Sequence, residues 1–374
     1  MTKDAQNTRV YAFQGMGVRA IAAPGHLEWL DEFLLPWFES SGRADFIKKK
    51  VTLVEDDNAH SALIRAPVVA PGQVGFVLDG PPALLESRRA ASGELWFYDE
   101  ELDVFYRIEG DEIRVVARPG AREGRFSMAR LIRELFMERA FATGEPVLHA
   151  AAVALNGRAA LILGNKGAGK TTLSINCVAR LGFGFIANDR VAVLPGAEGH
   201  PRVQGIPTLV RVRRSSLPLL PELPWSRLTH RYSSRETLAR ALELGAEHPA
   251  NADHLEVKEA EYLSPAQHCW LMNTRPMVGA RLGLLLFPQV DATVDGILLE
   301  RLDPREALAG LRVGAFNNNA EIESSRVFAQ APVTIGLIEQ RLAAIAANIP
   351  AWRCRLGPRA FEDRDTLVRL MGEH

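Results

Sequence analysis

A glycine-rich segment in the middle of the chain has the residue types and spacing of a phosphate-binding loop. Residues 164–171 match the pattern G-x-x-x-x-G-K-[ST], with an apolar strand-like run before them and a helix-compatible run after them. Glycines let successive backbone N–H groups surround phosphate oxygens, and the N-terminus of the following helix adds a favourable dipole. The lysine would contact the β- and γ-phosphates, and the threonine hydroxyl could bind Mg²⁺. We therefore expect ATP, with GTP as the alternative, and Mg²⁺ to bind at Gly164, Asn165, Lys166, Gly167, Ala168, Gly169, Lys170, Thr171 and Thr172.

Two further segments carry side chains that could act on the γ-phosphate. A short apolar run downstream of the loop ends in Asn188-Asp189, and His149 lies fifteen residues before Gly164. An acid on a strand next to a phosphate-binding loop commonly completes the metal site. Asp189 therefore joins Thr171 as a candidate metal ligand, and His149 is a candidate acid–base group.

From His149 to Asp189 the sequence resembles the HPr kinase/phosphorylase family, whose P-loop arrangement is shared with phosphoenolpyruvate carboxykinases. It is also similar to the kinase-like homologues encoded with modified-peptide pathways, which carry a β-rich region before the same core. The resemblance implies an α/β nucleotide-binding core of this type, preceded by a smaller β-rich α+β domain. The residues that carry it are His149, Val153, Asn156-Gly157, Leu161–Gly164, the loop itself and Gly182–Asp189.

The resemblance also implies a role for each matching residue. Lys170 and Thr171 would hold the triphosphate and Mg²⁺. Asp189 would lie near the metal, and His149 beside the phosphates. The family's first acid, which accepts the proton of the substrate hydroxyl, is replaced by Asn188, and an amide cannot take a proton at neutral pH although it can bind Mg²⁺ or orient a hydroxyl. Three interpretations stay open: Asp189 or His149 is the base, early proton removal is not needed in a loose transition state, or no hydroxyl is phosphorylated.

Phosphoryl transfer also requires a cation for the charge that develops on the γ-phosphoryl group. The family places an arginine shortly before a buried strand in the second half of the domain. Arg281, directly ahead of the apolar run 282–287, has a similar position, and Arg275 is the alternate. We expect Arg281 to lie beside the phosphates; its other interpretation is a surface arginine that flanks a strand.

These features favour an ATP-dependent kinase, a phosphotransferase that moves the γ-phosphate to a hydroxyl of a peptide or protein Ser/Thr or of a small molecule. The alternative, motivated by Asn188, is a nucleotide-binding or nucleotide-hydrolysing module or switch that phosphorylates no hydroxyl. Carboxykinase-type chemistry on a carboxylate metabolite is a third interpretation, but the chain is short for it. The expected partner is the acceptor, and the sequence is compatible with a homo-oligomer.

Composition argues against several other classes of protein. The 374 residues are 47% hydrophobic and 24% charged, and their net charge of −1 gives no global attraction to nucleic acid or to an anionic membrane. Neither a signal-peptide pattern nor an apolar run of transmembrane length is present. Three widely spaced cysteines do not suggest a disulfide framework. We expect a cytoplasmic protein with buried thiols and neither a nucleic-acid nor a membrane partner.

The chain is expected to form two domains. Residues 1–122 contain several β-branched or aromatic runs and one helical run near 27–39, which predicts a small α+β domain of largely antiparallel strands that recognises the acceptor. Residues 123–374 predict the α/β nucleotide-binding domain. Within it, Asn156-Gly157 predicts a hairpin turn, and residues 303–306 predict the capped start of a helix.

Two polar segments lead to further predictions. Ser127 is expected to cap a helix with one apolar face, whose opposite face, with Arg130 and Arg133, would be a solvated surface or an interdomain seam. Residues 201–240 are rich in arginine, and the stretch after them is mostly acidic. The arginine-rich segment could receive an acidic or phosphorylated substrate, or it could pair with the acidic stretch.

Overall fold

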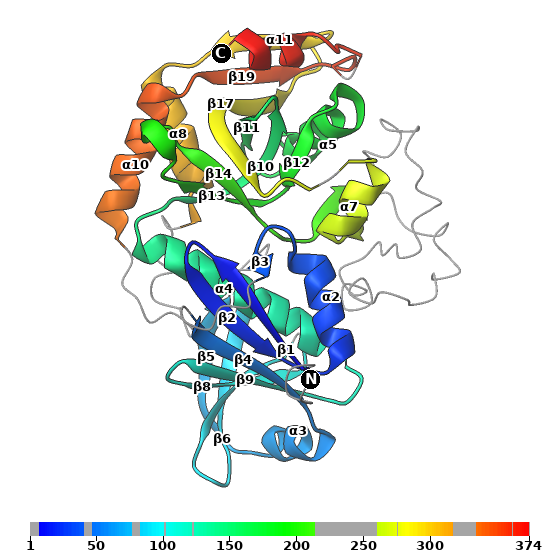
Figure 1. Cartoon of the computed structure of the whole chain (residues 1–374), viewed down its shortest axis with the longest axis vertical. Helices are drawn as coiled ribbons and strands as arrows, with labels where there is room; N and C mark the ends of the chain where they lie inside the picture. Colours follow the sequence, from blue (N-terminus) through cyan, green and yellow to red (C-terminus); the bar gives the residue numbers. More distant parts are fainter. Residues whose placement is uncertain are drawn as a thin grey trace. The chain divides into compact units, whose positions relative to one another are not determined.

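The computed structural model describes residues 7–40, 47–76, 83–100, 102–121, 123–213, 260–274, 276–316, 334–360 and 362–373. Within these residues the chain forms two compact units, one up to Arg139 and the other from Ala140 onward (Figure 1). The predicted boundary followed residue 122, whereas this one lies inside a helix. Both units combine helices with a multi-stranded sheet, so the chain is of the mixed α/β class. Among the described helices, none combines the length and the apolar character that a membrane crossing requires.

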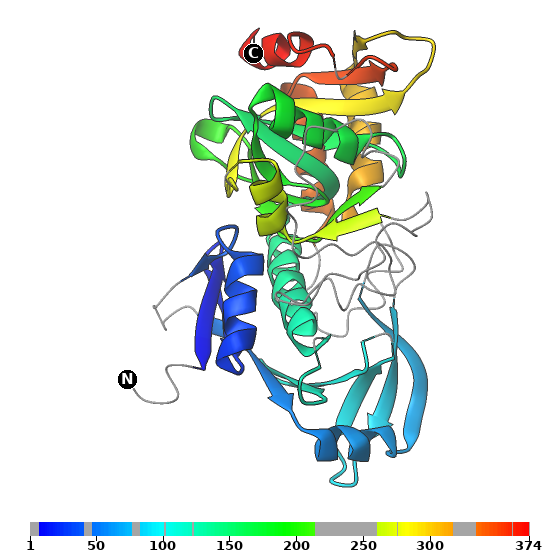
Figure 2. The same ribbon diagram turned by 90° about the vertical axis from the view of Figure 1, so that its right-hand side faces the viewer.

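The first unit contains a nine-stranded sheet in the order β3-β1-β2-β4-β9-β8-β7-β6-β5. The strands of this unit are drawn in blue to cyan in Figure 2. Its neighbouring strands pair antiparallel, as predicted, except that β4 is parallel to both β2 and β9. A short helix that the sequence pattern did not predict, α3, follows β4 and covers a cluster around Trp96 and Phe105. The elements are β1 (Thr8–Phe13), β2 (Met16–Ile21), α2 (Pro24–Leu34), β3 (Glu39–Ser40), β4 (Ile47–Glu55), α3 (Asp57–Ile64), β5 (Val68–Phe76), β6 (Ala83–Arg89), β7 (Leu95–Asp99), β8 (Val104–Glu109) and β9 (Glu112–Ala117).

The helix α4 (Glu123–Ala142) corrects two predictions. It begins at Glu123, so Ser127 is not its cap; the Ser127 hydroxyl instead donates a hydrogen bond of 2.8 Å to the Glu123 carbonyl, one turn earlier in the helix. Arg130 and Arg133, which were expected on a solvated surface or an interdomain seam, are buried. Arg130 is 1% exposed and lies 3.1 Å from Asp99, a residue of β7 that is equally buried. Burial of an arginine is tolerated here because a carboxylate is buried with it.

The main sheet of the second unit closes on itself. Its strands follow the order β11-β10-β13-β14-β17-β19-β18, and an additional parallel pairing joins β17 back to β11. β12 pairs with β10, and β19 is parallel to β17. The strands are β10 (Val147–Leu155), β11 (Arg158–Leu163), β12 (Gly184–Ala187), β13 (Arg190–Leu194), β14 (Arg202–Ile206), β17 (Gly279–Val290), β18 (Ile297–Arg301) and β19 (Ala351–Leu356).

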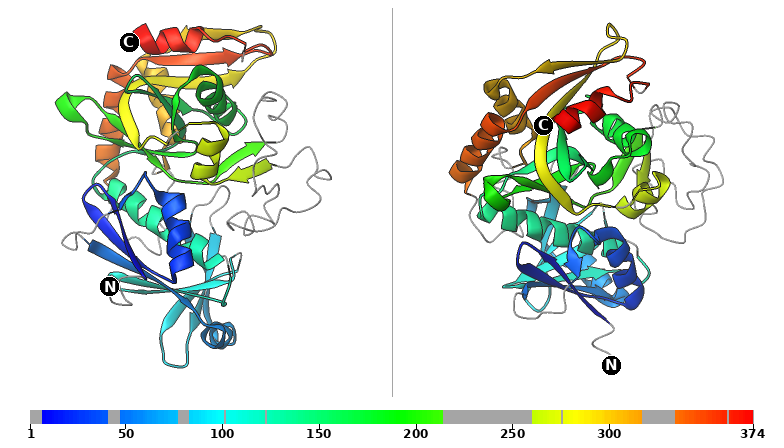
Figure 3. Two further views of the ribbon diagram at one scale, coloured as in Figure 1. Left: turned by 45° about the vertical axis from the view of Figure 1, so that its right-hand side comes forward. Right: turned by 45° about the horizontal axis from the view of Figure 1, so that its top comes forward.

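Local signals in this unit are confirmed. Asn156 and Gly157, with φ of 52° and 78°, form the tight turn between β10 and β11. Asp303 caps a helix in a reciprocal capping box with Glu306. That helix, α8, contacts β10 and β11 and packs on α10, while α5 lies on the other side of these strands (Figure 3). The remaining elements are α5 (Lys170–Leu181), the short helix η1 (Ala197–Gly199), the strand pair β15 (Val210–Arg213) and β16 (Ala260–Leu263), α7 (Pro265–Leu271), α8 (Pro304–Gly314), α10 (Ile335–Asn348) and α11 (Thr366–Glu373).

The three cysteines are buried and free, as predicted. Burial raises the pKa of the Cys354 thiol to about 12 and also raises that of Cys177. Both thiols therefore stay protonated at neutral pH, which makes them inert packing groups.

Candidate functional site

The glycine-rich loop, residues 164–169, connects the end of β11 to the start of α5. Gly167 and Gly169 have φ of 89° and 99°, a region that other residues enter only with strain. Ala168 donates a backbone hydrogen bond of 3.1 Å to the Asn165 carbonyl, which forms a tight turn inside the loop. The glycines are therefore required by the backbone path at these positions, and the loop leads directly into a helix.

Lys170, the first residue of α5, places a positive charge in this loop. Its side chain is buried, with 8% exposed, and Nζ donates hydrogen bonds of 2.6 Å to the Gly164 carbonyl and 3.4 Å to the Asn165 carbonyl. The first N–H groups of a helix have no partner within the helix and carry partial positive charge. Thr171 and Thr172 lie in the same first turn and are half-buried. The lysine and the helix start together make this turn attractive to an anion.

Strand pairing brings His149 to the level of the loop. Ala150 on β10 pairs with Leu163, the last residue of β11, so His149 lies beside the point where the loop begins. The same Ala150 donates its backbone N–H to the Asp189 carbonyl at 2.9 Å. His149 itself pairs with Arg190, the first residue of β13. The structure thus brings together the loop, His149 and the Asn188-Asp189 turn, which are far apart in the sequence.

The Asp189 carboxylate contacts two side chains of this edge, His149 and Arg190. Its Oδ1 lies 3.1 Å from Nδ1 of His149, and its Oδ2 lies 3.5 Å from Nε of Arg190. The Asp189 side chain is 16% exposed and the adjacent Asn188 is buried. Because the carboxylate accepts from Nδ1–H, it favours the tautomer in which Nε2 of His149 carries no proton. Asp189 is therefore placed to orient the imidazole.

Two further residues, Arg190 and Phe316, lie beside His149, and the sequence analysis assigned no role to either. Arg190 is 3% exposed, and its guanidinium lies 4.9 Å from the ring centroid of Phe316. The Phe316 ring also meets His149 edge-on, with centroids 5.9 Å apart. Arg190 directly follows Asp189 in the sequence, but only the pairing of β10 with β13 shows that it faces His149. Phe316 follows α8 and carries no signal of its own.

The structure does not bring Arg281 to this group. Arg281 pairs with Arg158, the first residue of β11, whereas the loop follows the last residue of that strand. Five residues of extended strand separate the two levels, which is about 16 Å. Arg275, the alternate, lies outside the described residues. The arginine that lies beside Asp189 is Arg190.

Two oxygen-bearing side chains, Thr171 and Asp189, are the sequence-predicted metal ligands at this edge. In the described part of the chain, no group of three or more His, Cys, Asp or Glu side chains could hold a metal ion. Mg²⁺ usually takes one or two protein oxygens and completes its shell with phosphate and water. The Thr171 hydroxyl and the Asp189 carboxylate are oxygen ligands of this kind.

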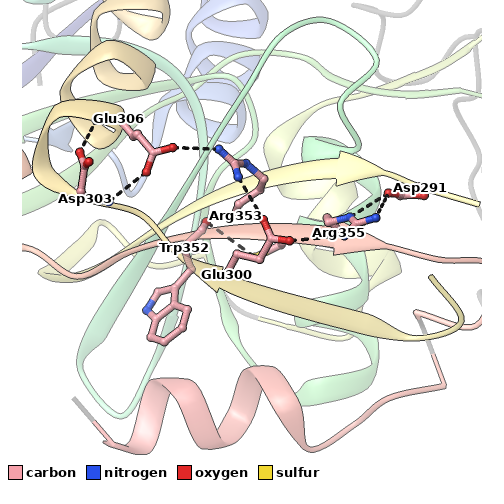
Figure 4. A network of polar contacts seen from close by, with 8 residues as sticks. Asp291, Glu300, Asp303, Glu306, Trp352, Arg353 and Arg355 are labelled. Carbon is pink, nitrogen blue, oxygen red and sulfur yellow. Dashed lines mark hydrogen bonds and ion pairs between the residues drawn. The ribbon is translucent and has the colours of Figure 1, made fainter. Parts of the chain in front are cut away.

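The ends of β17 and β19 flank the loop. A Cβ added at Gly169 would lie 3.4 Å from Leu356 and 3.6 Å from Val290. Next to these residues a chain of ion pairs, here termed the ion-pair ladder, joins Asp291, which directly follows β17, with β19, β18 and α8 (Figure 4). It consists of Asp291–Arg355 (2.7 Å), Arg355–Glu300 (3.4 Å), Glu300–Arg353 (3.0 Å) and Arg353–Glu306 (3.2 Å).

The pKa of Asp291 shows how well this end of the ladder is satisfied. Hydrogen bonds from the hydroxyl and backbone N–H of Thr293, and then from Arg355, lower the pKa of Asp291 to about 2. A carboxylate with several donors stays ionised over the whole physiological range. The ladder therefore links the strand ends next to the loop with charges that are already paired.

No protein-family model matches this sequence, and no curated protein matches it.

Proposed function

We propose that this protein is an ATP-dependent phosphotransferase of the HPr-kinase-like type, which transfers the γ-phosphate to a hydroxyl of a peptide, a protein or a small molecule. One observation carries the proposal. Pairing of Ala150 with Leu163, together with its hydrogen bond to the Asp189 carbonyl, places a lysine-containing glycine loop, an imidazole and a carboxylate at one edge of the sheet. A phosphate anchor and an acid–base pair at the same edge are what transfer to a hydroxyl requires.

Each residue of this edge would have a separate role in the transfer. Lys170 and the first turn of α5 would hold the β- and γ-phosphates, and Thr171 with Asp189 would hold Mg²⁺. Bound Mg²⁺ would neutralise charge on the phosphates. Nε2 of His149, left unprotonated by the bond from Nδ1–H to Asp189, would accept the proton of the acceptor hydroxyl. Arg190, which lies beside Asp189, would supply the cation that the family resemblance assigned to Arg281.

The test separates binding from transfer. Lys170→Ala should abolish ATP binding measured by calorimetry, because the loop loses its charge. Asp189→Ala should retain ATP binding in the absence of Mg²⁺ but lower transfer of labelled γ-phosphate into a pool of candidate acceptors by about 100-fold or more. The exposed residues Arg305 and Asp365 give matched controls, and their alanine variants should behave as the wild type. Unchanged turnover in either Lys170→Ala or Asp189→Ala would sink the assignment.

A second function is favoured by one specific feature, the amide at residue 188. Asn188, at the position where the resemblance expects the acid that accepts the hydroxyl proton, is buried, and the neighbouring Asp189 already contacts His149 and Arg190. A nucleotide-dependent switch would bind ATP tightly, hydrolyse it slowly and phosphorylate no acceptor. The Asn188→Asp variant distinguishes the two: transfer that appears only after this substitution supports the switch, whereas transfer by the wild type supports the kinase.

A further inference from the structure

Three arginines lie in register at the end of the closed sheet away from the glycine-rich loop. Arg281 on β17 pairs with Arg158 on β11 on one side and with Arg202 on β14 on the other. Paired residues of neighbouring strands project their side chains from the same face. Arg202 and Arg281 are exposed and Arg158 is half-buried. We call these three residues the arginine cluster.

The cluster is not neutralised within the described part of the chain. No acidic side chain there forms an ion pair with any of its three members. Like charges directly opposite one another on a sheet are destabilising. If the three arginines only stabilised the fold, we would expect an acidic side chain to pair with them, as in the ion-pair ladder of the same sheet.

One member of the cluster is held in place by packing. The Arg158 guanidinium donates a hydrogen bond of 3.2 Å to the Met371 carbonyl and lies across Gly283. A Cβ at Gly283 would come within 3.0 Å of Arg158 Nε, so the glycine leaves the room that this side chain occupies. The Arg158 side chain is therefore held in place beside the two exposed arginines, and its positive charge lies on the same face of the sheet as theirs.

We propose that the arginine cluster is a docking surface for an acidic segment of a protein partner. Guanidinium groups bind carboxylates with two parallel hydrogen bonds, and clusters of arginine are a recurring means of recognising acidic motifs. Three adjacent strands span about 10 Å. An extended peptide covers that width with about three residues, so several carboxylates of an acidic segment lie within reach of the row.

The same dimensions argue against other anions. A nucleic-acid surface neutralises many phosphates along a track, whereas this cluster has three cations in a chain whose net charge is −1. A single phosphate is smaller than a row of side chains that spans about 10 Å over three strands. The carboxylate-rich peptide is the occupant that uses all three arginines.

The surface is separate from the proposed catalytic edge, because Arg158 and the loop lie at opposite ends of β11. Binding at the cluster can therefore be measured without nucleotide, and its outcome does not depend on phosphotransfer. A protein that fails as a kinase could still pass this test, and the reverse also holds.

The probe is a fluorescein-labelled oligo-glutamate peptide, titrated with the full chain and followed by fluorescence anisotropy. We expect saturable binding that weakens as salt is raised. Arg281→Glu should weaken it by about tenfold, and Arg202→Glu combined with Arg281→Glu should abolish it, because each reversal replaces an attraction by a repulsion. Arg281→Lys, which keeps the charge but not the planar fork, should give a smaller loss.

Arg305→Glu is the matched control, since it makes the same charge change at an exposed arginine of α8 and should alter affinity less than twofold. Thermal unfolding of each variant verifies that it is folded. The proposal is overturned if Arg281→Glu binds as the wild type does, or if an oligo-glutamine peptide of equal length binds as well. It is also overturned if duplex DNA binds more tightly than the peptide, or if inorganic phosphate displaces the peptide more effectively than free oligo-glutamate does.

Discussion

Two groups of arginines lie toward opposite ends of β17, and they differ in what surrounds them. In the ion-pair ladder, Arg353 and Arg355 each contact two acidic side chains. In the arginine cluster, Arg281 has an arginine on either side. The first arrangement joins strand ends through paired charges, whereas in the second the described residues contain no acid paired with the arginines. Under the docking proposal, the same residue type in one sheet is structural where an acid pairs with it and serves binding where none does.

The strongest test of this difference lies in the first unit, where an arginine is both paired and buried. Arg130→Met would remove the guanidinium that lies beside the buried carboxylate of Asp99. We expect the free energy of unfolding to fall by roughly 3–5 kcal/mol, the usual cost of breaking one side of a buried ion pair. Urea denaturation followed by circular dichroism measures the loss.

The control is the double variant Arg130→Met, Asp99→Asn, which also replaces the buried carboxyl group by an amide and should recover part of the stability. If Arg130→Met alone lowers the free energy of unfolding by less than about 1 kcal/mol, the pair behaves as a solvent-screened surface pair and the expectation for a buried pair is wrong.

This buried pair also shows where prediction from the sequence stopped. The apolar face of α4, the Asn156-Gly157 turn and the Asp303 cap depend on a few neighbouring residues, and all three are confirmed. The start of α4 and the burial of Arg130 depend on β7, which is distant in the sequence. Local patterns contain no information about such a partner.

The candidate site divides in the same way. The loop with Lys170 could be predicted because its geometry is encoded in consecutive residues. The position of Arg281 could not, because it depends on the direction in which β17 runs beside β11. The two strands are parallel, so a residue near the start of β17 lies at the start of β11 and away from the loop. When two strands are parallel, an arginine at the start of one strand therefore lies away from a loop that follows the end of the other.

The next prediction breaks the ion-pair ladder. Arg353→Met keeps the aliphatic stem but removes the contacts to Glu300 and Glu306. Because these side chains are partly exposed, solvent screens the pairs, and we expect the melting temperature to fall by only about 2 °C. Differential scanning calorimetry measures the shift, which should shrink at high salt. A melting temperature at or above that of the wild type would show that the ladder does not tie these strand ends together.

The smallest effect is expected at the arginine cluster, where a substitution should raise the melting temperature and not lower it. Arg281→Gln removes one cation from between two others, so the melting temperature should rise by about 1 °C, in contrast to the fall expected for Arg353→Met. The gain should disappear at high salt, because screening already weakens the repulsion in the wild type. A fall in melting temperature would mean that Arg281 is neutralised in the folded chain, and the distinction between paired and unpaired arginines would then fail at the residue on which it chiefly depends.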